Sequence, residues 1–348
     1  INGQFTARRL TGQERFAIEL VTAIDKICKK GDYELVVPKN AKFVPKLSNI
    51  SVIRYGKAKG SLWEQLYFAY YVIVKGRKSL NLCSIQPIFK PGIICIHDLA
   101  FKTNKQTSFW NLTFYKKVSK VWHILQYHIA KHFSPLVLTV SEYSKNEMVK
   151  VYHYNPSKVL VIGNGWEHFK RIAFDEQLKI KHPEYFERPY FFSLASLTPN
   201  KNFKWILKVA QKHPQYQFLI GGNANIRAYG TDFQDDSIKN VKFLGYISDG
   251  EVKTLMKYCK AFIFPSFFEG FGIPPLEALS VGASIIISNT TCLPEIFGKT
   301  AHYIDPYNVD VNLDEILSEP TVSPQKVLEK YTFARFAKIL HQKICSKN

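Results

Sequence analysis

The sequence predicts an α/β protein built from two Rossmann-like domains whose parallel sheets face a central cleft. Short apolar runs alternate with longer amphipathic runs along most of the chain, which is typical of parallel strands covered by helices on both faces. At 348 residues the chain exceeds what a single hydrophobic core usually organises. Its composition, 46% hydrophobic and 22% charged, is that of a globular protein.

The expected strands fall into two groups along the chain. The first group ends before a polar, charged segment at 166–188, and the alternation restarts after it. Two sheets of similar size predict two domains, which we place at residues 1–170 and 186–330. Ligands of such sheets bind beyond the carboxyl ends of the strands, so functional residues are expected directly after them. The apolar runs lie at 34–37, 92–98, 136–141, 159–165, 189–196, 216–222, 241–246, 261–266, 283–289 and 301–306.

Composition argues against several classes of protein. The longest apolar run, residues 66–74, is too short to span a bilayer, and the first residues lack the apolar segment of a signal peptide. We therefore expect a cytoplasmic protein. The six cysteines form no CxxC pair, which favours reduced, buried thiols over disulfides or a zinc site.

The net charge of +19 indicates an anionic partner. No acidic residue occurs between Leu99 and Ser141, and lysines alternate with aromatic residues over residues 101–133. This stretch predicts a surface for anionic lipid or for nucleic acid. A pair of amphipathic helices with solvated lysines is the alternative. His128 and His132 have helical spacing, but the pattern offers no third ligand, so we interpret them as basic-face residues and not as a metal site.

The stretch FPSFFEGFGIPPLEAL, residues 264–279, predicts a strand, a loop and a helix. Pro265 marks the end of the strand. The prolines of PPLEAL suit the first turn of a helix, and Gly282 suits its end. Gly270 and Gly272 let the loop backbone approach a ligand. Because a helix N-terminus attracts anions, this unit predicts a phosphate site.

Two glutamates flank the start of this helix. Glu269 lies in the loop, and the side chain of Glu277 tilts back toward the loop from the first turns of the helix. A sugar nucleotide presents hydroxyl groups on both sides of its diphosphate, so each carboxylate can accept hydrogen bonds from one sugar. The alternative is that Glu277 only complements the helix dipole and that Glu269 is an exposed loop residue.

The chain resembles the retaining glycosyltransferases of family 4, which have the GT-B fold and an E-x7-E motif. That motif is Glu269 to Glu277 in EGFGIPPLEAL. The resemblance covers nearly the whole chain, and it implies that residues 1–170 bind the acceptor, that 186–330 bind the donor, and that a final helix within 331–348 packs back on the first domain. Other similar segments are RLTGQERFAIEL, IHDLAF, LTVSEYSKNEM, VIGNGWEHF, SLASLTPNKN, SNTTCLPEIFG and YIDPYNVD.

The resemblance also implies roles for individual residues. Lys201 would hold the donor diphosphate and offset the charge that develops on the leaving group; the alternative is a surface lysine. Asn200 stands where the family usually carries an arginine, which removes one cation from the phosphate site. His97 would lie near the donor sugar and the reacting centre, or else be a structural residue at a strand end. Gly12 would lie near the diphosphate or the acceptor.

These expectations together define a site. Asp235 and Asp236 lack the strand-end setting of a metal-binding DxD motif, so no metal and no other cofactor is expected. Lys201 and the helix end would take over that function. The expected catalytic residues are His97, Lys201 and Glu269. The expected donor-binding residues are Gly12, Asn200, Lys201, Glu269, Gly270, Phe271, Gly272, Ile273 and Glu277.

The resemblance implies transfer of a hexose, of the mannose, rhamnose or glucose class, from a nucleotide diphosphate sugar to a saccharide acceptor, with retention at the anomeric carbon. GDP-mannose is the first choice of donor, and UDP- and dTDP-linked sugars are the alternatives. A polyprenyl-diphosphate-linked acceptor would place the protein peripherally on the inner face of the cytoplasmic membrane. The process implied is assembly of a bacterial surface polysaccharide such as O-antigen, capsule or exopolysaccharide.

Two rival interpretations remain. Another sugar-nucleotide enzyme of the same fold, such as an epimerase, would share the nucleotide site but would need its own acid and base pair. A non-enzymatic nucleic-acid-binding protein would explain the charge and would bind with a steep salt dependence. Two carboxylates at a helix N-terminus would repel a polyanion, so we expect no nucleic-acid partner.

Overall fold

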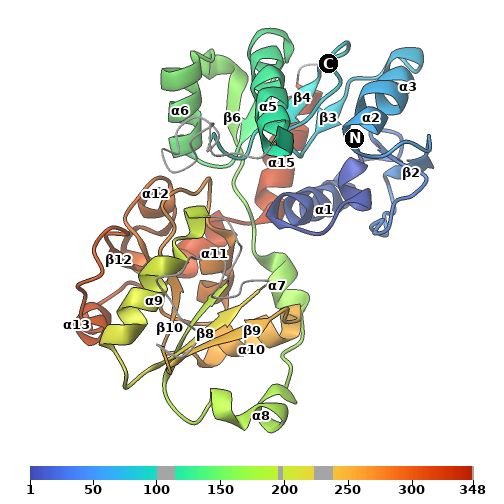
Figure 1. Ribbon diagram of the computed structural model, residues 1–348. Coiled ribbons are helices and arrows are strands. Elements are labelled where there is room, and N and C mark those ends of the chain that lie inside the picture. The colour runs from blue at the N-terminus through green and yellow to red at the C-terminus, as the bar shows by residue number, and fades with distance from the viewer. Residues whose placement is uncertain (100–113, 195–198, 223–237, 347–348) are drawn as a thin grey trace. The chain divides into compact units, whose positions relative to one another are not determined.

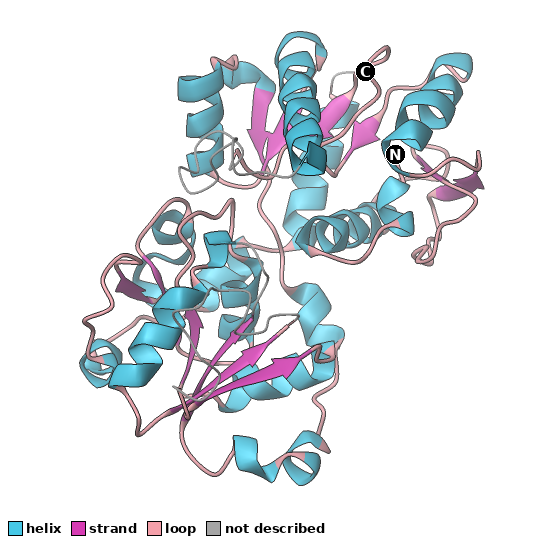
Figure 2. Cartoon of the chain, in the orientation of Figure 1, coloured by secondary structure: helices cyan, strands magenta, loops and turns pink. Residues whose placement is uncertain are grey.

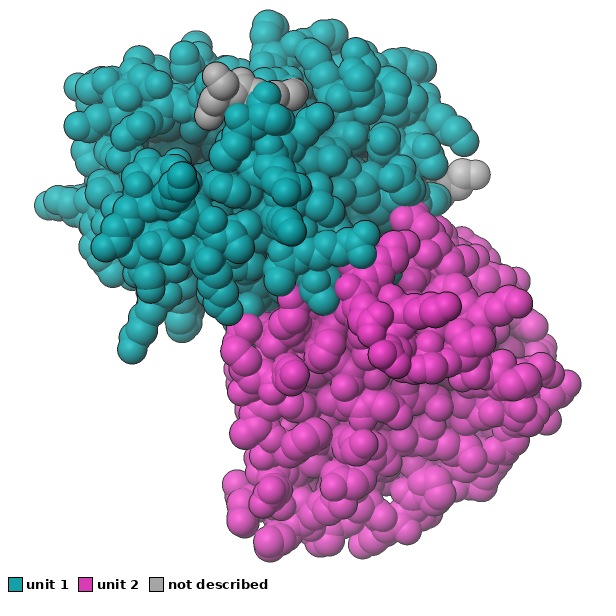
Figure 3. All heavy atoms as spheres, turned by 180° about the vertical axis from the view of Figure 1, so that it is seen from behind, with its two compact units in different colours: residues 1–165, 331–348 teal, residues 166–330 magenta. Residues whose placement is uncertain are grey.

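The computed structural model describes residues 1–99, 114–194, 199–222 and 238–346 (Figure 1). They form two compact units, residues 1–165 with 331–348 and residues 166–330 (Figure 3). Residues 166–170, which we expected in the first domain, lie in the second unit. The reason is that Lys253 Nζ donates hydrogen bonds to the carbonyl oxygens of Phe169, at 2.9 Å, and Ile172, at 2.6 Å.

Unit 1 is built on parallel strands. Four of them form one sheet in the order β3-β4-β5-β6, and β1 pairs with β2 beside it. The first residues of the chain join the two sheets: Gly3 N donates to the Val36 carbonyl at 2.8 Å, and Asn2 N donates to the Leu80 carbonyl at 2.9 Å. The strands are β1 (Glu34–Val37), β2 (Ser51–Arg54), β3 (Leu80–Asn81), β4 (Ile93–Cys95), β5 (Val137–Thr139) and β6 (Val159–Val161).

Helices flank these strands (Figure 2). In the first helix Thr11 and Glu14 form a capping box, which satisfies amide groups at the helix start. The last helix packs against the first, with the ring centres of the buried Phe16 and Phe333 6.2 Å apart. The helices are η1 (Gln4–Ala7), α1 (Gly12–Asp25), α2 (Gly60–Leu62), η2 (Trp63–Phe68), α3 (Ala69–Val74), α5 (Phe114–Phe133), α6 (Glu142–Tyr152), η4 (Pro156–Lys158) and α15 (Phe333–Cys345).

Unit 2 contains a six-stranded parallel sheet in the order β12-β11-β10-β7-β8-β9. Its strands are β7 (Tyr190–Leu194), β8 (Gln217–Gly221), β9 (Val241–Gly245), β10 (Ala261–Phe264), β11 (Ile285–Ser288) and β12 (His302–Ile304). Its helices are α7 (Glu167–Arg171), α8 (Leu178–Lys181), η5 (Pro183–Tyr185), η6 (Pro199–Lys201), α9 (Phe203–Lys212), α10 (Asp249–Tyr258), α11 (Ile273–Ser280), α12 (Leu293–Phe297), η8 (Gly298–Thr300), α13 (Leu313–Ser318) and α14 (Gln325–Lys330).

The strand order of unit 2 contains a topological switch point. β7 is the first strand; β8 and β9 extend the sheet on one side of it, and β10, β11 and β12 extend it on the other. The connections therefore reverse direction between β7 and β10. In doubly wound sheets the loops after two such strands diverge and leave a crevice at their carboxyl ends, where ligands bind. The fully buried Phe191 and Ile263 hold β7 and β10 in the core beneath these loops.

The predicted α/β class with parallel sheets is confirmed. Every apolar run taken as a strand contains one. β2 and β3 escaped prediction because the first exposes most of its side chains and the second has only two residues. Among the helices that the structure describes, none is long and apolar enough to cross a bilayer.

Candidate active site

The two loops at the switch point of unit 2 are held together by Asn200. Residue 200 belongs to the loop after β7, and residues 265–272 form the loop after β10. The carbonyl of Asn200 accepts a hydrogen bond from Phe267 N at 2.9 Å, and its side-chain amide donates to the Phe268 carbonyl. The expected donor-binding residue is therefore a structural tie between the two loops, at a position where the resembled family carries a cation.

Asn202 extends this tie to a third loop. Its φ of 52° lies in the left-handed region, which asparagine adopts more readily than most residues. From there its buried amide donates to the carbonyls of Pro265, at 3.1 Å, and Pro306, at 2.8 Å. The loops after β7, β10 and β12 are thus fixed relative to one another. We did not single out Asn202 from the sequence, although an asparagine directly before a helix is a recognisable signal.

Lys201 and Glu269 form an ion pair across the switch point. Lys201 Nζ lies 2.6 Å from Glu269 Oε1, and the two side chains are 25% and 12% exposed. The ammonium group also lies 5.0 Å from the ring centre of Phe264, the last residue of β10. Two residues expected at one site are therefore in direct contact, one from each loop. A lysine can bind a phosphate there, and a carboxylate can accept hydrogen bonds from sugar hydroxyls.

The loop between β11 and α12 holds the backbone of Glu269. Thr291 Oγ1 accepts a hydrogen bond from Glu269 N at 3.2 Å, and Cys292 Sγ donates to the Glu269 carbonyl at 3.2 Å. Thr291 has a φ of 54°, which is unfavourable for a β-branched residue. Burial, followed by the charges of Glu269 and Glu295, raises the pKa of the Cys292 thiol well above its usual range. Cys292 therefore stays protonated and acts as a hydrogen-bond donor.

The helix that follows starts as the sequence predicts. α11 begins at Ile273, with Gly272 as its N-cap at a φ of +99° and two prolines in its first turn. Phe271 is buried, whereas Gly270 and Ile273 are partly exposed. The phenyl ring therefore anchors the loop, and the backbone around Gly270 and Ile273 remains open to a ligand.

We expect Gly272→Ala to destabilise the protein. A methyl group on this residue would lie 2.8 Å from Leu293 Cδ2, and the left-handed backbone is unfavourable for alanine. The expected loss of unfolding free energy is about 1–3 kcal/mol, measured by chemical denaturation. Gly282→Ala, also at positive φ but with only the end of Lys257 nearby at 3.8 Å, is the matched control for the backbone contribution alone. An equal loss in both variants would contradict a steric role for Gly272.

Glu277 is held by a histidine that we did not predict. Its Oε1 lies 2.6 Å from His168 Nε2, and the two side chains are 10% and 2% exposed. Figure 1 shows that α7, which carries His168, lies beside α11. Glu277 is thus neither a solvated helix-dipole residue nor freely mobile, because its carboxylate has a fixed orientation. His168 lies in VIGNGWEHF, a segment that we quoted for its resemblance without assigning this side chain a role.

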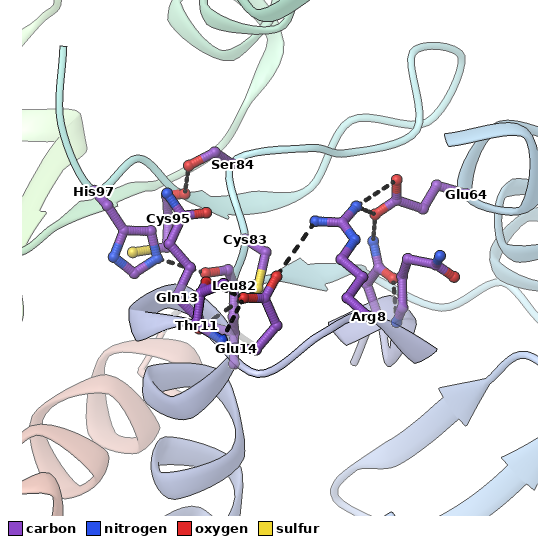
Figure 4. A network of polar contacts seen from close by, with 12 residues as sticks. Arg8, Thr11, Gln13, Glu14, Glu64, Leu82, Cys83, Ser84, Cys95 and His97 are labelled. Atoms are coloured by element: carbon purple, nitrogen blue, oxygen red, sulfur yellow. Dashed lines mark hydrogen bonds and ion pairs between the residues drawn. The ribbon is translucent and has the colours of Figure 1, made fainter. Parts of the chain in front are cut away.

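In unit 1, His97 is enclosed. It follows β4, its Nε2 lies 2.8 Å from the Leu82 carbonyl oxygen, and its ring packs edge-on against Phe16 at 4.7 Å (Figure 4). Burial lowers the pKa of the imidazole. The neutral ring donates from Nε2 to the carbonyl, which leaves Nδ1 as its acceptor nitrogen. Gly12 is the exposed first residue of α1. The catalytic role of His97 and the ligand contact of Gly12 stay predictions.

Arg8 lies next to the start of α1, between two buried glutamates (Figure 4). Its guanidinium lies 3.3 Å from Glu64 Oε2 and 3.9 Å from Glu14 Oε1. Thr11 N donates to Glu14 at 3.2 Å, and Asn2 donates to Glu64 at 3.1 Å. Burial raises the pKa of Glu64 to about 7, although Arg8 and Asn2 lower it. The network fixes the partly exposed guanidinium of Arg8. Sequence reasoning did not single out Arg8, because Glu64, the acid nearest to it in space, is 56 residues away in the chain.

Some predictions fall outside what the structure describes. Asp235 and Asp236 lie there, as does the first part of the basic, aromatic segment, residues 101–113. Within the described residues no group of three or more histidine, cysteine, aspartate or glutamate side chains could hold a metal ion. The expectation that no metal is required stays a prediction.

Comparison with known proteins connects the site to a family. Residues 174–319, which contain Lys201, Glu269 and Glu277, match the model of the family described as Glycosyl transferases group 1. Unit 2 therefore contains a group 1 glycosyltransferase region. The matched region includes the switch-point loops but not His168, and it covers unit 2 alone.

Two relatives of the chain are named O-antigen chain mannosyltransferases. O-antigen chain mannosyltransferase B of Escherichia coli is 26% identical over 203 residues, which are 55% of this chain and 52% of that protein. The chain thus spans about half the length of that relative. O-antigen chain mannosyltransferase RfbU of Salmonella typhimurium is 26% identical over 316 residues, which are 85% of this chain and 83% of RfbU.

Two solved structures extend the fold assignment to both units of the chain. HepE of Anabaena, solved in complex with UDP and glucose, has a TM-score of 0.71 at 14% identity and covers 97% of each chain. Sucrose-phosphate synthase from Thermosynechococcus elongatus has a TM-score of 0.74 at 14% identity, covering 97% of this chain and 94% of that one. The predicted GT-B fold is confirmed.

Proposed function

We propose that this glycosyltransferase transfers a hexose from a nucleotide diphosphate sugar to a saccharide acceptor, with retention at the anomeric carbon. The observation that carries the proposal is the Lys201–Glu269 ion pair at the switch point of unit 2. It combines a cation suited to a diphosphate with a carboxylate suited to sugar hydroxyls, at the strand ends where such sheets bind nucleotides. Unit 1 takes the acceptor.

In the proposed mechanism Lys201 and the start of α11 bind the diphosphate. The helix contributes the Ile273 amide group and the positive end of its dipole, since the two prolines that follow have no N–H and Leu276 N donates to the Gly272 carbonyl. The partly exposed Gly270 leaves the preceding backbone open to the phosphates. As the glycosidic bond breaks, negative charge grows on the leaving diphosphate, and the fixed ammonium group of Lys201 stabilises it. This arrangement needs no metal ion to neutralise the leaving group.

The two glutamates bind the sugars on either side of the diphosphate. His168 holds the Glu277 carboxylate in one orientation, and Thr291 and Cys292 hold the backbone of Glu269. Carboxylates that are already oriented lose little freedom when they accept hydroxyl hydrogen bonds. The acceptor oxygen attacks on the face that the diphosphate leaves, and the departing phosphate accepts its proton. Retention then requires no nucleophile from the protein.

We infer that the product belongs to a bacterial surface polysaccharide and that the acceptor is linked to polyprenyl diphosphate. Two of the relatives described above are named O-antigen chain mannosyltransferases, which supports a mannosyl donor and makes GDP-mannose the first choice. UDP and dTDP sugars remain the alternatives, and HepE was solved with UDP. Arg8, fixed by Glu14 and Glu64, offers unit 1 a cation for the acceptor's diphosphate.

We further propose that the protein is peripheral on the inner face of the cytoplasmic membrane. The described part of the basic, aromatic segment is α5, where Val118, Val121 and Leu125 are exposed on one side of the helix. Lys117 and Lys120 lie among them and are partly exposed. An apolar helix face with lysines beside it suits the boundary between headgroups and acyl chains of an anionic membrane.

The donor proposal predicts a selective rise in melting temperature. GDP-mannose should stabilise the full chain without magnesium, whereas the same concentration of UDP- or dTDP-sugars should stabilise it less, because only a ligand bound to the folded state shifts unfolding. Thermal unfolding with each nucleotide sugar, with and without magnesium, measures this. No shift with any nucleotide sugar, or a shift only with magnesium, would contradict the proposed site.

Product analysis separates transfer from its alternatives. With donor and a soluble saccharide acceptor, the one-bond C1–H1 coupling of the newly linked sugar reports retention or inversion, also for mannose, whose H1–H2 coupling is small in both anomers. Donor incubated without acceptor is the control, since an epimerase would convert it and a transferase would not. Inversion, or conversion without acceptor, would refute the proposed reaction while leaving nucleotide binding intact.

A further inference from the structure

The helical segment formed by α2, η2 and α3, residues 60–74, is apolar on two sides. Its inner side buries Trp63, Phe68 and Val72 against Val36 of β1. Its outer side carries a second apolar row, each member of which is more than half exposed. The spacing of these residues, i, i+4, i+8, i+11 and i+12, places them on one helix face, where a water-facing helix would carry polar residues. We name this row the apolar stripe: Leu62, Leu66, Tyr70, Ile73 and Val74.

A neighbouring loop adds a further exposed aromatic ring. Phe89 is 86% exposed. Its loop is tied to the helix by Gln65, whose Nε2 donates to the Gln86 carbonyl at 2.9 Å and whose Oε1 accepts from Ile88 N at 2.9 Å. Gln65 precedes Leu66 of the stripe, and Ile88 precedes Phe89. The stripe and Phe89 therefore belong to one surface, which we call the docking face.

The charges around the docking face are positive. The only acidic residue between positions 55 and 92 is Glu64, which points inward and is 1% exposed in its network with Arg8. Every basic residue of the same stretch is exposed. These residues are Lys57, Lys59, Lys75, Arg77, Lys78 and Lys90. Arg77 pairs with the partly exposed Glu34 of β1 at 3.2 Å, so one charge of the rim is neutralised and the excess there is positive. An apolar centre with a rim of net positive charge complements an anionic, apolar partner.

We infer that the docking face binds an anionic phospholipid bilayer. Lysine side chains reach headgroup phosphates while their alkyl parts, tyrosine rings and aliphatic side chains enter the boundary with the acyl chains. The segment lies in the membrane surface and does not cross it, since it is far too short to do so. The docking face is separate from α5 in sequence. It is therefore a second lipid-binding element in addition to the one proposed for α5.

Docking would also orient unit 1 toward its substrate. Glu64 lies on the inner side of the helical segment 60–74 and fixes Arg8. The arginine therefore lies about one helix diameter, roughly 10 Å, from the bilayer surface. This depth places the Arg8 guanidinium near the level of the diphosphate in a lipid-linked acceptor, a step that rests on the proposed function. Lipid binding itself does not depend on that proposal.

Flotation of the full chain with vesicles tests the inference. Phosphatidylcholine vesicles are compared with vesicles that also contain phosphatidylglycerol, without donor or acceptor. Phe89→Ser and Leu66→Ser should each lower partitioning to the anionic vesicles by about tenfold, because each removes a large apolar side chain from the bilayer. Ile180→Ser, at a 72% exposed position of α8 in unit 2, is the matched control and should bind like the unaltered protein.

Charge-reversal substitutions test the basic residues around the docking face. Lys90→Glu should weaken binding to anionic vesicles by severalfold and flatten its salt dependence, whereas Lys326→Glu, on α14 of unit 2, should do neither. Unchanged partitioning of Phe89→Ser and Leu66→Ser would overturn the inference, and so would a dimer in solution that Leu66→Ser converts to monomers. The same variants are also assayed for transfer to a soluble acceptor. This assay tests the proposed reaction separately from lipid binding.

Discussion

Lys201→Ala is expected to lower kcat by about two to three orders of magnitude, the effect of removing one preorganised group that stabilises a leaving charge. The ammonium group is in place before substrate arrives, because it is paired with Glu269 at 2.6 Å and lies over the Phe264 ring. The kcat of each variant is measured from the rate of nucleoside diphosphate release, in reactions that are stopped at set times. Lys204→Ala, an exposed lysine at the start of α9, is the matched control and should keep its turnover.

A second variant separates the roles of the ion pair. Lys201→Ala leaves Glu269 without its cation, so the carboxylate repels the diphosphate and donor binding also weakens. Adding Glu269→Gln removes that repulsion. The double variant should recover part of the donor affinity without recovering turnover. Normal kcat in Lys201→Ala would rule out its role in leaving-group stabilisation, and recovered turnover in the double variant would assign the effect to Glu269 alone.

Glu277→Gln is expected to weaken binding of the nucleotide sugar by about tenfold to a hundredfold, the usual worth of a charge-assisted hydrogen bond. Glutamine preserves the shape of the side chain, so the fold should remain while the acceptor strength of the oxygens falls. Titration calorimetry with the nucleotide sugar measures the change. Glu295→Gln, an exposed acid on α12 to which we assign no role, is the matched control.

His168 gives this prediction a structural check. His168→Ala would leave the buried Glu277 carboxylate without its partner at 2.6 Å, so it should lower both donor affinity and stability. His168→Gln, which can still donate to the carboxylate, should recover part of both. If Glu277→Gln binds donor as the unaltered protein does, Glu277 contacts no sugar, and the His168 pair only joins α7 to α11.

The strands could be predicted where apolar runs are buried on both faces. β7 and β10 are of this kind, and a run such as AFIF is typical of a central strand in an α/β domain with helices on both faces of its sheet. The exposed β2 and the two-residue β3 have no such pattern. Their pairing depends on the central strands beside them and on the first residues of the chain, which a local pattern does not contain.

The candidate site was only partly predictable for a similar reason. Lys201, Glu269 and Glu277 stand next to strand ends and a proline-started helix, and those signals are local. Asn200 was interpreted by the position it occupies in a family, yet its amide holds the neighbouring loop.

Local sequence patterns were enough to predict the fold class, the division into two groups of strands, and the loop and helix of residues 264–279. These follow from backbone preferences and from side chains a few residues apart. The pairing of Lys201 with Glu269 and of His168 with Glu277 could not be predicted in this way, since the partners are separated by 68 and 109 residues and meet only in the folded chain. Strand order sets which loops meet, and residues this far apart make contact only after the sheet has assembled.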